Sequence, residues 1–242
     1  ARAISKNSNV SVSKVRLPVP LPSRISKGNR RHFGIPEKDF VVLSSFDFRS
    51  DFHRKNPLAG IEAFKAAFKK ESGALLILKS SNSAEFPAEF ASVELACANR
   101  PDIRLVTEIL PVYENNLLLD CADVFLSLHR AEGYGINLID CMARGKPVVA
   151  TGFSGNLDYM NDTNSLLVPF ELNRVHFYGG VNVESHWAEP DIEFASVKLR
   201  ELFRDQSFYR RISLNARNDV VEGHSLPRAV DQFRNGFTNA GF

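Results

Sequence analysis

The sequence lacks the features that would place it in a specialised structural class. It contains only three cysteines, Cys97, Cys121 and Cys141, and their spacing fits no metal-binding motif. Each cysteine lies in an apolar stretch of helical character, so we predict free thiols in a reducing compartment. We also find no internal repeat and no low-complexity segment. These absences leave an ordinary globular chain.

Charge and hydrophobicity also exclude two classes of partner. The chain carries 30 Lys and Arg against 28 Asp and Glu, so its net charge of +2 provides no basic surface for nucleic acid or an anionic membrane. No apolar run approaches the roughly 18 residues needed to cross a bilayer, and the first residues lack a signal-peptide pattern. We therefore predict a cytoplasmic protein with no transmembrane segment and no nucleic-acid partner, whose ligand is a small molecule.

The order of apolar segments predicts an α/β fold. Hydrophobic residues make up 44% of the 242 residues, enough for one large domain. Residues 1–32 are polar and contain a proline-rich stretch, which favours an extended arm or linker over a helix. Beyond them, short apolar runs alternate with stretches of helical period. We predict strands at 41–46, 74–79, 103–106, 124–128, 147–151 and 165–168, an excursion loop at 171–187, and helices at 190–204, 207–218 and 225–238.

The character of these strands indicates a doubly wound parallel sheet of the Rossmann-like type. The run 74–78 is apolar at every position, as expected of a strand covered on both faces. A helix should begin with Asn56 as N-cap and Pro57 as its first residue, and its apolar residues recur at the spacing of one buried face. In such folds ligands bind beyond the carboxyl ends of the strands, so the functional residues should lie there.

The most informative segment is 127–140, which reads as a strand end, a glycine-containing turn and a helix start. Gly133 and Gly135 lack a Cβ that would keep a ligand from the backbone. The helix that begins near Ile136 should present unpaired N–H groups, an arrangement that suits a phosphate. Glu132 and Asp140 lie on either side of this helix start, where their carboxylates can accept hydrogen bonds from sugar hydroxyls.

Several nearby polar residues allow more than one interpretation. We expect His129, at the end of a buried strand, to be a structural histidine rather than a ligand contact. The run 154–156 can either cap the helix that follows or contact the ligand. The basic residues of the linker are expected to be solvated rather than part of a phosphate site: Arg24, Lys27, Arg30 and Arg31.

The segment from Glu132 to Asp140, followed by 142–151, resembles the signature of retaining GT-B glycosyltransferases of family 4. The resemblance continues through 154–160 and 187–191 and covers roughly residues 33–235. It implies the C-terminal half of a GT-B fold with terminal helices, whose domain over 33–242 binds a nucleotide sugar. Glu132 would contact the donor sugar as a catalytic residue and Asp140 would hold the ribose. The remaining donor-binding positions would be Gly133, Tyr134, Gly135, Ile136 and Asn137.

Two positions depart from the family pattern. Asp140 stands where the family has a glutamate, so its shorter side chain needs a shift or a bridging water to reach the ribose. Lys55 matches the catalytic lysine that neutralises the donor diphosphate, but the accompanying arginine is replaced by Ser50. The sequence leaves Arg49, Arg54 and Arg130 as alternative replacements, and catalysis by charge stabilisation makes this choice important.

The resemblance also implies the partners of the chain. The donor would be a GDP-, UDP- or ADP-linked sugar and the acceptor a sugar or glycan, with polysaccharide biosynthesis as the process and neither a cofactor nor a metal required. The segment 15–22 resembles the crossing between the two GT-B domains. We therefore expect residue 1 to lie near the end of an N-terminal acceptor domain, without which the chain is inactive and through which it could attach peripherally to a membrane.

Two other functions fit parts of the pattern. A non-catalytic nucleotide-binding or regulatory module would explain the Glu-to-Asp change and the absent arginine. An epimerase or phosphorylase on a GT-B scaffold would share the fold, although the sequence shows no pyridoxal-phosphate lysine motif. Product analysis with a labelled donor separates these functions from a hexosyltransferase.

Overall fold

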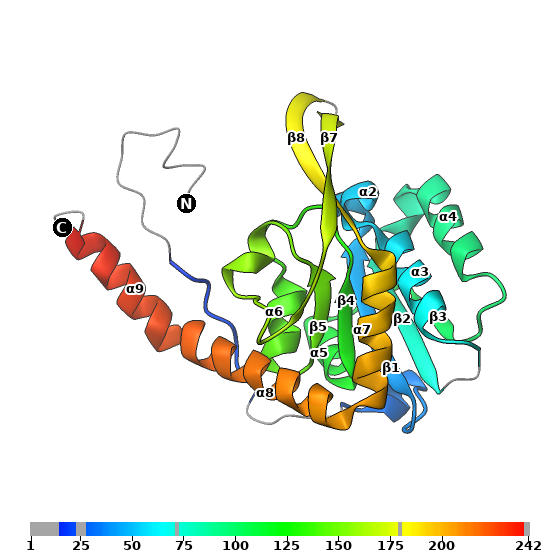
Figure 1. Ribbon diagram of the computed structural model, residues 1–242, viewed down its shortest axis with the longest axis horizontal. Coiled ribbons are helices and arrows are strands. Elements are labelled where there is room, and N and C mark those ends of the chain that lie inside the picture. The colour runs from blue at the N-terminus through cyan, green and yellow to red at the C-terminus, as the bar shows by residue number, and fades with distance from the viewer. Residues whose placement is uncertain (1–14, 23–27, 71–72, 179–180, 240–242) are drawn as a thin grey trace.

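The computed structural model describes residues 15–22, 28–70, 73–178 and 181–239, which form a sheet covered by helices on both faces (Figure 1). Six parallel strands follow the order β3-β2-β1-β4-β5-β6. This is the predicted doubly wound α/β fold, and each strand lies within two residues of its predicted bounds. The strands are β1 (Phe40–Asp47), β2 (Ala74–Ser81), β3 (Ile103–Val106), β4 (Val124–Ser127), β5 (Val148–Thr151) and β6 (Leu166–Val168).

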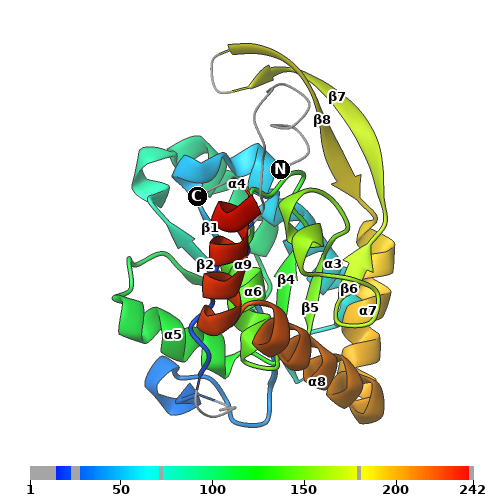
Figure 2. The ribbon, with the colours of Figure 1, turned by 90° about the vertical axis from the view of Figure 1, so that its left-hand side faces the viewer.

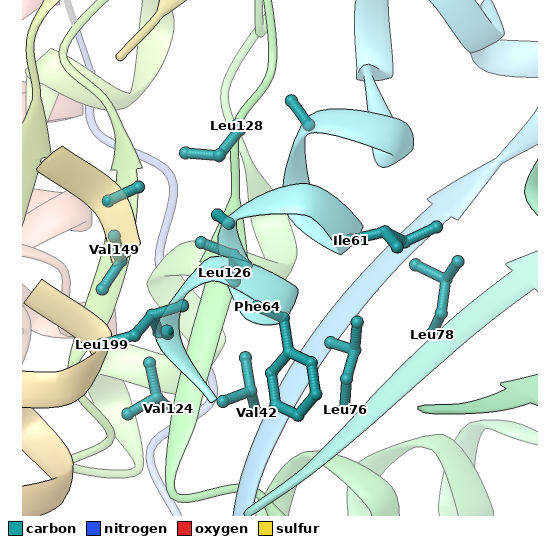
Figure 3. Close-up of a cluster of buried hydrophobic side chains, with 14 of the residues drawn as sticks. Val42, Ile61, Phe64, Leu76, Leu78, Val124, Leu126, Leu128, Val149 and Leu199 are labelled. Carbon is teal, nitrogen blue, oxygen red and sulfur yellow. The ribbon is translucent and has the colours of Figure 1, made fainter. Parts of the chain in front are cut away.

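Alternate side chains of the central strands enter two separate cores, because successive strand residues point to opposite faces. Val42 belongs to a core with the helices α3 (Pro57–Ala67), α4 (Pro87–Cys97) and α7 (Ile192–Arg204). Figure 3 shows Phe64 of α3 between Val42 and Leu76. Val41 belongs to the opposite core, with α5 (Val112–Cys121), α6 (Ile136–Ala143) and α8 (Gln206–Gly223).

The remaining elements connect these layers. After α8 the chain continues as α9 (Leu226–Asn239), which extends away from the sheet (Figure 1). The three terminal helices are those that the sequence predicts, but α8 continues five residues past its predicted end at residue 218. No helix of the described residues is long and apolar enough to cross a membrane. The short elements are η1 (Arg30–Phe33), η2 (Phe48–Ser50), α2 (Phe52–Lys55), η3 (Ser83–Glu85) and η4 (Gly155–Asp158).

All three cysteines lie in helices and are free thiols, as predicted. Cys97 ends α4, Cys121 ends α5 and Cys141 lies within α6. Burial raises the pKa of the Cys121 thiol to about 11 and that of Cys141 to about 12. Both are therefore protonated at neutral pH and behave as small apolar core residues.

The segment predicted as an excursion loop is instead an antiparallel hairpin. Strands β7 (Phe170–Tyr178) and β8 (Val181–Pro190) pair with Phe170 opposite Pro190, and both views show the hairpin projecting beyond one end of the sheet (Figures 1 and 2). The prediction of a loop was wrong, although residues 171–174 are all exposed, as expected of an excursion from the domain. Apolar and polar residues alternate over 170–173 and 181–184, and this period of two was the available signal for strands.

Two local predictions also need correction. Asn56 occupies the N-cap position of α3, but it adopts a left-handed conformation with φ 52° and makes no capping hydrogen bond. Its side-chain amide instead donates to the carbonyl of Leu128 at 3.0 Å, joining the α3 start to the end of β4. Asparagine tolerates this left-handed conformation better than most residues do, which explains its presence at position 56.

Arg30 is buried rather than solvated, with 3% of its surface exposed. Its guanidinium donates to the carbonyls of Cys121 and Asp39 and forms an ion pair with Asp123 at 2.7 Å. Asp123 also accepts from the amide of Val41 at 2.8 Å. Arg30 therefore joins the residues that precede β1 to those that precede β4. Arg31 is exposed as expected, whereas Arg24 and Lys27 lie outside the described residues.

Arg30→Met should lower the free energy of unfolding by about 3 kcal/mol, because it leaves Asp123 and several carbonyls without their charged donor. Arg31→Met is the matched control, since Arg31 is the exposed neighbour of Arg30; its effect should stay within about 0.5 kcal/mol. Urea unfolding of the two variants and the wild-type chain measures both values. Equal losses in the two variants would show that the buried contacts of Arg30 contribute nothing specific.

Candidate functional site

A cavity of about 450 Å³ opens at the carboxyl ends of β1, β2 and β4, the edge at which a parallel sheet is expected to bind its ligand. Its wall is completed by the loop before α6 and by the first turn of that helix. Six of the residues proposed from the sequence line it: Lys55, Glu132, Tyr134, Gly135, Ile136 and Asn137. Four others do not line it: Arg54, Arg130, Gly133 and Asp140.

The loop before α6 is held in place by Tyr159. The Tyr159 hydroxyl donates to the carbonyl oxygens of Tyr134 and Gly135, at 2.7 and 2.8 Å. Gly135 has φ 84°, and a Cβ at this position would lie 2.7 Å from the Tyr159 hydroxyl oxygen. Glycine is therefore required here by both the backbone conformation and the packing of Tyr159. Gly133, in contrast, faces open space, where a Cβ would meet no atom within 4 Å.

Ser154 and Gly155 support the same loop from a second side. The Ser154 hydroxyl accepts from the amide of Glu132 at 2.7 Å, and the amide of Gly155 donates to the Glu132 carbonyl at 2.9 Å. A Cβ on Gly155 would lie 1.9 Å from the carbonyl oxygen of Gly133. Ser154 and Gly155 therefore hold the backbone at Glu132, whereas the Asn156 amide donates to the Thr151 carbonyl at 3.0 Å. Ser154 makes no side-chain capping hydrogen bond, and none of the three residues lines the cavity.

Lys55 and Glu132 form an ion pair within the cavity wall. Lys55 Nζ lies 2.5 Å from Glu132 Oε2, and the two side chains are only 19% and 10% exposed. Glu132 Oε1 also accepts from the amide of Gly133 at 3.0 Å. Burial opposes ionisation of Glu132, but the contact with Lys55 outweighs it, so the pKa of this carboxyl lies below its ordinary value. The carboxylate is therefore charged at neutral pH.

His129 has the structural role expected from the sequence. It is fully buried, with Nδ1 3.0 Å from the Ser127 hydroxyl and Nε2 3.3 Å from the Phe153 carbonyl oxygen. Burial lowers the pKa of this histidine, which favours the neutral imidazole. Its contacts join the end of β4 to the loop that follows β5.

None of the three candidate arginines lines the cavity, and each contacts protein groups. Arg54 donates to the carbonyls of Ala131 and Ser50, at 2.7 and 2.6 Å. Arg130 pairs with Glu189 of β8 at 2.6 Å, and Arg49 pairs with Glu85. In the part of the chain that the structure describes, no arginine lines the cavity. These side chains instead fix the loops around it, and Arg130 connects the hairpin to the end of β4.

Asp140 lies one turn into α6, half-buried and outside the cavity lining. No hydrogen bond to its carboxylate is present among the described residues, although Arg144 is near enough to interact with its charge. Burial raises the pKa of this carboxyl, and Arg144 offsets part of the effect. A partly buried carboxylate without a donor is a suitable acceptor for a ligand hydroxyl.

The sequence analysis missed two charged residues of the cavity wall, Asp47 and Lys79. Lys79 ends the apolar part of β2 and is only 5% exposed. The available signal was a lysine directly after an unbroken apolar run. Buried lysines are rare, so a lysine at such a position indicates a specific role. Several neutral polar residues also line the cavity and were not predicted: Ser45, Ser81, Asn115 and Ser127.

Comparison with known structures identifies this fold among glycosyltransferases. The C-terminal domain of a glycosyl transferase group 1 family protein (LpcC) from Francisella tularensis is 17% identical, with 88% of this chain and 97% of that domain covered at a TM-score of 0.61. A glycosyltransferase from Rickettsia africae is 17% identical over 85% of this chain and 49% of its own, with a TM-score of 0.65. Anabaena HepE in complex with UDP-glucose is 15% identical, with 88% and 51% covered and a TM-score of 0.60.

The chain thus spans about half the length of the last two proteins, 49% and 51%. The similarities establish the Rossmann-like fold of a C-terminal GT-B domain. No curated protein sequence matches the chain.

A family model gives the assignment itself. The model for glycosyl transferases group 1 matches residues 48–182, more than half of the 242-residue chain. The match includes α2 with Lys55, the loop with Glu132 and all of α6. The chain therefore belongs to the group 1 glycosyl transferases.

Proposed function

We propose that this chain is the donor-binding half of a retaining GT-B glycosyltransferase of family 4. It would transfer a hexose from a nucleoside-diphosphate sugar to an acceptor sugar or glycan. The observation that carries this proposal is the Lys55–Glu132 ion pair, which lies in one cavity with the N-terminus of α6. That cavity offers positive groups for a diphosphate and a carboxylate for sugar hydroxyls.

The start of α6 is suited to the diphosphate. Its N-cap, Gly135, has no side chain and therefore makes no capping hydrogen bond to the first turn. The amides of Leu138 and Ile139 bond to the Gly135 carbonyl, while Ile136 and Asn137 precede them in the cavity wall. Amides of a first turn and the helix dipole both favour an anion at this position.

Lys55 would act on the leaving diphosphate, and Glu132 would contact the donor sugar. In the proposed reaction the bond between the donor sugar and the diphosphate breaks, and negative charge grows on the departing phosphate oxygen. Lys55 and the α6 amides would stabilise that charge, which lowers the barrier most where water is excluded. Glu132 would accept hydrogen bonds from hydroxyls of the donor sugar. We propose that these groups suffice without a metal ion or cofactor.

Asp140 would hold the ribose of the nucleotide. Because it lies outside the cavity lining, this contact requires the ligand to extend along α6 beyond the cavity, or a bridging water. Arg54 and Arg130 would act indirectly, by fixing the loops that carry Lys55 and Glu132. HepE, which has the same fold, was solved with UDP-glucose, so UDP is the first nucleotide to test, followed by GDP and ADP.

The complete enzyme would need an acceptor-binding domain. The chain covers 49% and 51% of two of its structural neighbours. We propose that transfer to a glycan in polysaccharide biosynthesis occurs only with a second domain. That domain would also supply any peripheral contact with a membrane. A non-catalytic nucleotide-binding module is the second candidate, favoured by the lack of an arginine among the described cavity residues. A labelled donor that is bound but never consumed by the two-domain protein would support it.

The chain should bind a nucleoside diphosphate with a dissociation constant between about 1 μM and 1 mM, because the proposed phosphate and ribose contacts all lie within it. Isothermal calorimetry with UDP, GDP and ADP measures this constant. Absence of both heat and thermal stabilisation with all three nucleotides at millimolar concentration would exclude a donor site.

Lys55→Ala should weaken UDP binding much more than uridine binding, since the ammonium group acts on the phosphates. The loss should shrink as salt is added. The pKa of Glu132 should rise in this variant, because burial opposes its ionisation and Lys55 is the main group that favours it.

Lys65→Ala is the control for this experiment. Lys65 lies on α3 and pairs with Glu62 outside the cavity. Its loss should therefore leave the affinities for UDP and uridine unchanged. If Lys55→Ala reduced uridine and UDP binding equally, Lys55 would not be a phosphate ligand.

Glu132→Gln and Asp140→Asn should have opposite effects in the two-domain enzyme. Loss of the Glu132 charge should lower turnover about 100-fold, or about 2.7 kcal/mol, while UDP affinity stays the same or improves because Lys55 is released. Asp140→Asn should raise the dissociation constant of UDP about tenfold, or about 1.4 kcal/mol, with little change in turnover at saturating donor.

Calorimetry followed by turnover measurements at saturating donor separates the two roles. Melting temperatures should remain near that of the wild-type protein, which distinguishes ligand contacts from support of the fold. Indistinguishable profiles for the two variants, or full turnover in Glu132→Gln, would contradict the assignment.

A further inference from the structure

Lys79 lies where β2 reaches the cavity. In the sheet it is paired with Ser45 of β1, and Leu75, Ile77 and Lys79 follow one another on the same face of β2. Leu75 and Ile77 belong to the core that includes Leu138 and Ile139 of α6. Lys79 therefore continues, at the carboxyl end of the strand, the face of the sheet that packs against α6.

The first turn of α6 is connected to this position. Asn137 donates from its side-chain amide to the Ser45 hydroxyl at 2.7 Å, and Ser45 is the residue opposite Lys79 in the sheet. Asn137, Ser45 and Lys79 all line the cavity. An anion at the N-terminus of α6 would thus lie in the same cavity as the Lys79 ammonium group.

Lys79 determines the net charge of the cavity wall. Among the described residues that line the cavity, the ionisable acids and bases with formal charge are Asp47, Glu132, Lys55 and Lys79. Lys55 is already paired with Glu132 at 2.5 Å. Without Lys79 the wall would therefore have a net negative charge, which disfavours a diphosphate.

The Lys79 ammonium group bonds to a neutral partner. Its Nζ donates to the carbonyl of Ser80 at 2.7 Å. The nearby carboxylates of Asp47 and Glu108 attract it only at longer range, and Asp47 itself accepts from the Asn82 side chain at 2.8 Å. Burial lowers the pKa of Lys79, and these two acids only partly oppose the effect. A bound anion would stabilise the charged form.

We propose that Lys79 is a second phosphate ligand of the donor site, acting from β2 in the same cavity as Lys55. This inference rests on the proposed function, because it assumes that a nucleoside diphosphate binds here. No arginine of the described residues lines the cavity, and Lys79 of β2 would provide the positive charge in its place. Lys79 would hold the diphosphate before and after the sugar leaves.

The test compares two buried lysines at opposite ends of the sheet. Lys146 precedes β5 and is 4% exposed, against 5% for Lys79, and its Nζ likewise donates to a backbone carbonyl, that of Asp120, at 2.9 Å. Lys79→Met and Lys146→Met thus remove a buried ammonium group in each case. Only the first removes it from the cavity. Lys79→Arg keeps the charge.

Calorimetry with UDP and uridine on the full chain measures the effect. We expect Lys79→Met to weaken UDP binding at least tenfold with uridine binding unchanged, and the loss to shrink with added salt. Lys146→Met should stay within twofold of the wild-type chain for both ligands, and Lys79→Arg should retain most of the UDP affinity. GDP and ADP replace UDP, with their own nucleosides, if the wild-type chain prefers them.

A measurement on the wild-type protein keeps the proposal testable if Lys79→Met fails to fold. With ε-¹³C-labelled lysine, NMR titration should show the pKa of Lys79 rising when UDP binds and staying constant with uridine. Wild-type binding of UDP together with unchanged affinity in Lys79→Met, or an unchanged Lys79 pKa, would overturn this inference and leave the proposed function standing. Failure of the wild-type chain to bind any of the three nucleotides would overturn both.

Discussion

The common direction of the six strands is the constraint on which the site depends. Because all of them are parallel, the carboxyl ends of β1, β2 and β4 meet at one edge, and the chain must leave each strand through a loop at that edge. This arrangement brings Lys55, Lys79 and Glu132 to one cavity although they are far apart in sequence. The helices between the strands bury both faces of the sheet and keep the edge fixed.

The loop before α6 has little structure of its own and depends on its neighbours. Tyr159 bonds to two of its carbonyls, while Ser154 and Gly155 fix both backbone groups of Glu132. These contacts restrict Glu132 before any ligand arrives, which lowers the entropy that binding must remove. The supporting residues follow β5, so the position of the Glu132 carboxylate depends on the pairing of β4 with β5.

The features predicted from the sequence are those with a local pattern of residues. The features that it missed depend on contacts between residues far apart in the chain. Unbroken apolar runs located the strands, and the glycines with Glu132 located the loop before α6. The hairpin β7–β8 was missed although apolar and polar residues alternate over 170–173 and 181–184, because the pairing of its two strands is a contact that the sequence does not show. The burial of Arg30 follows from Asp123 and the Cys121 carbonyl, whose proximity only the folded chain creates. Lys79 carried a visible signal, a charge at the end of an apolar strand, but its neighbours on β1 and α6 were required to interpret it.

Arginines and lysines have different places around the proposed donor site. Arg54 and Arg130 use their planar donor groups on backbone carbonyls and on Glu189, so they fix the loops around the cavity. Among the residues that the structure describes, the two cations that line it are lysines, Lys55 and Lys79. A guanidinium binds two oxygens in a fixed plane, whereas an ammonium group is a compact charge on a flexible stem. In the proposed reaction the diphosphate changes position and charge as the sugar leaves. Two lysines, one at the end of α2 and one on β2, can follow that movement while the arginine-supported loops remain in place.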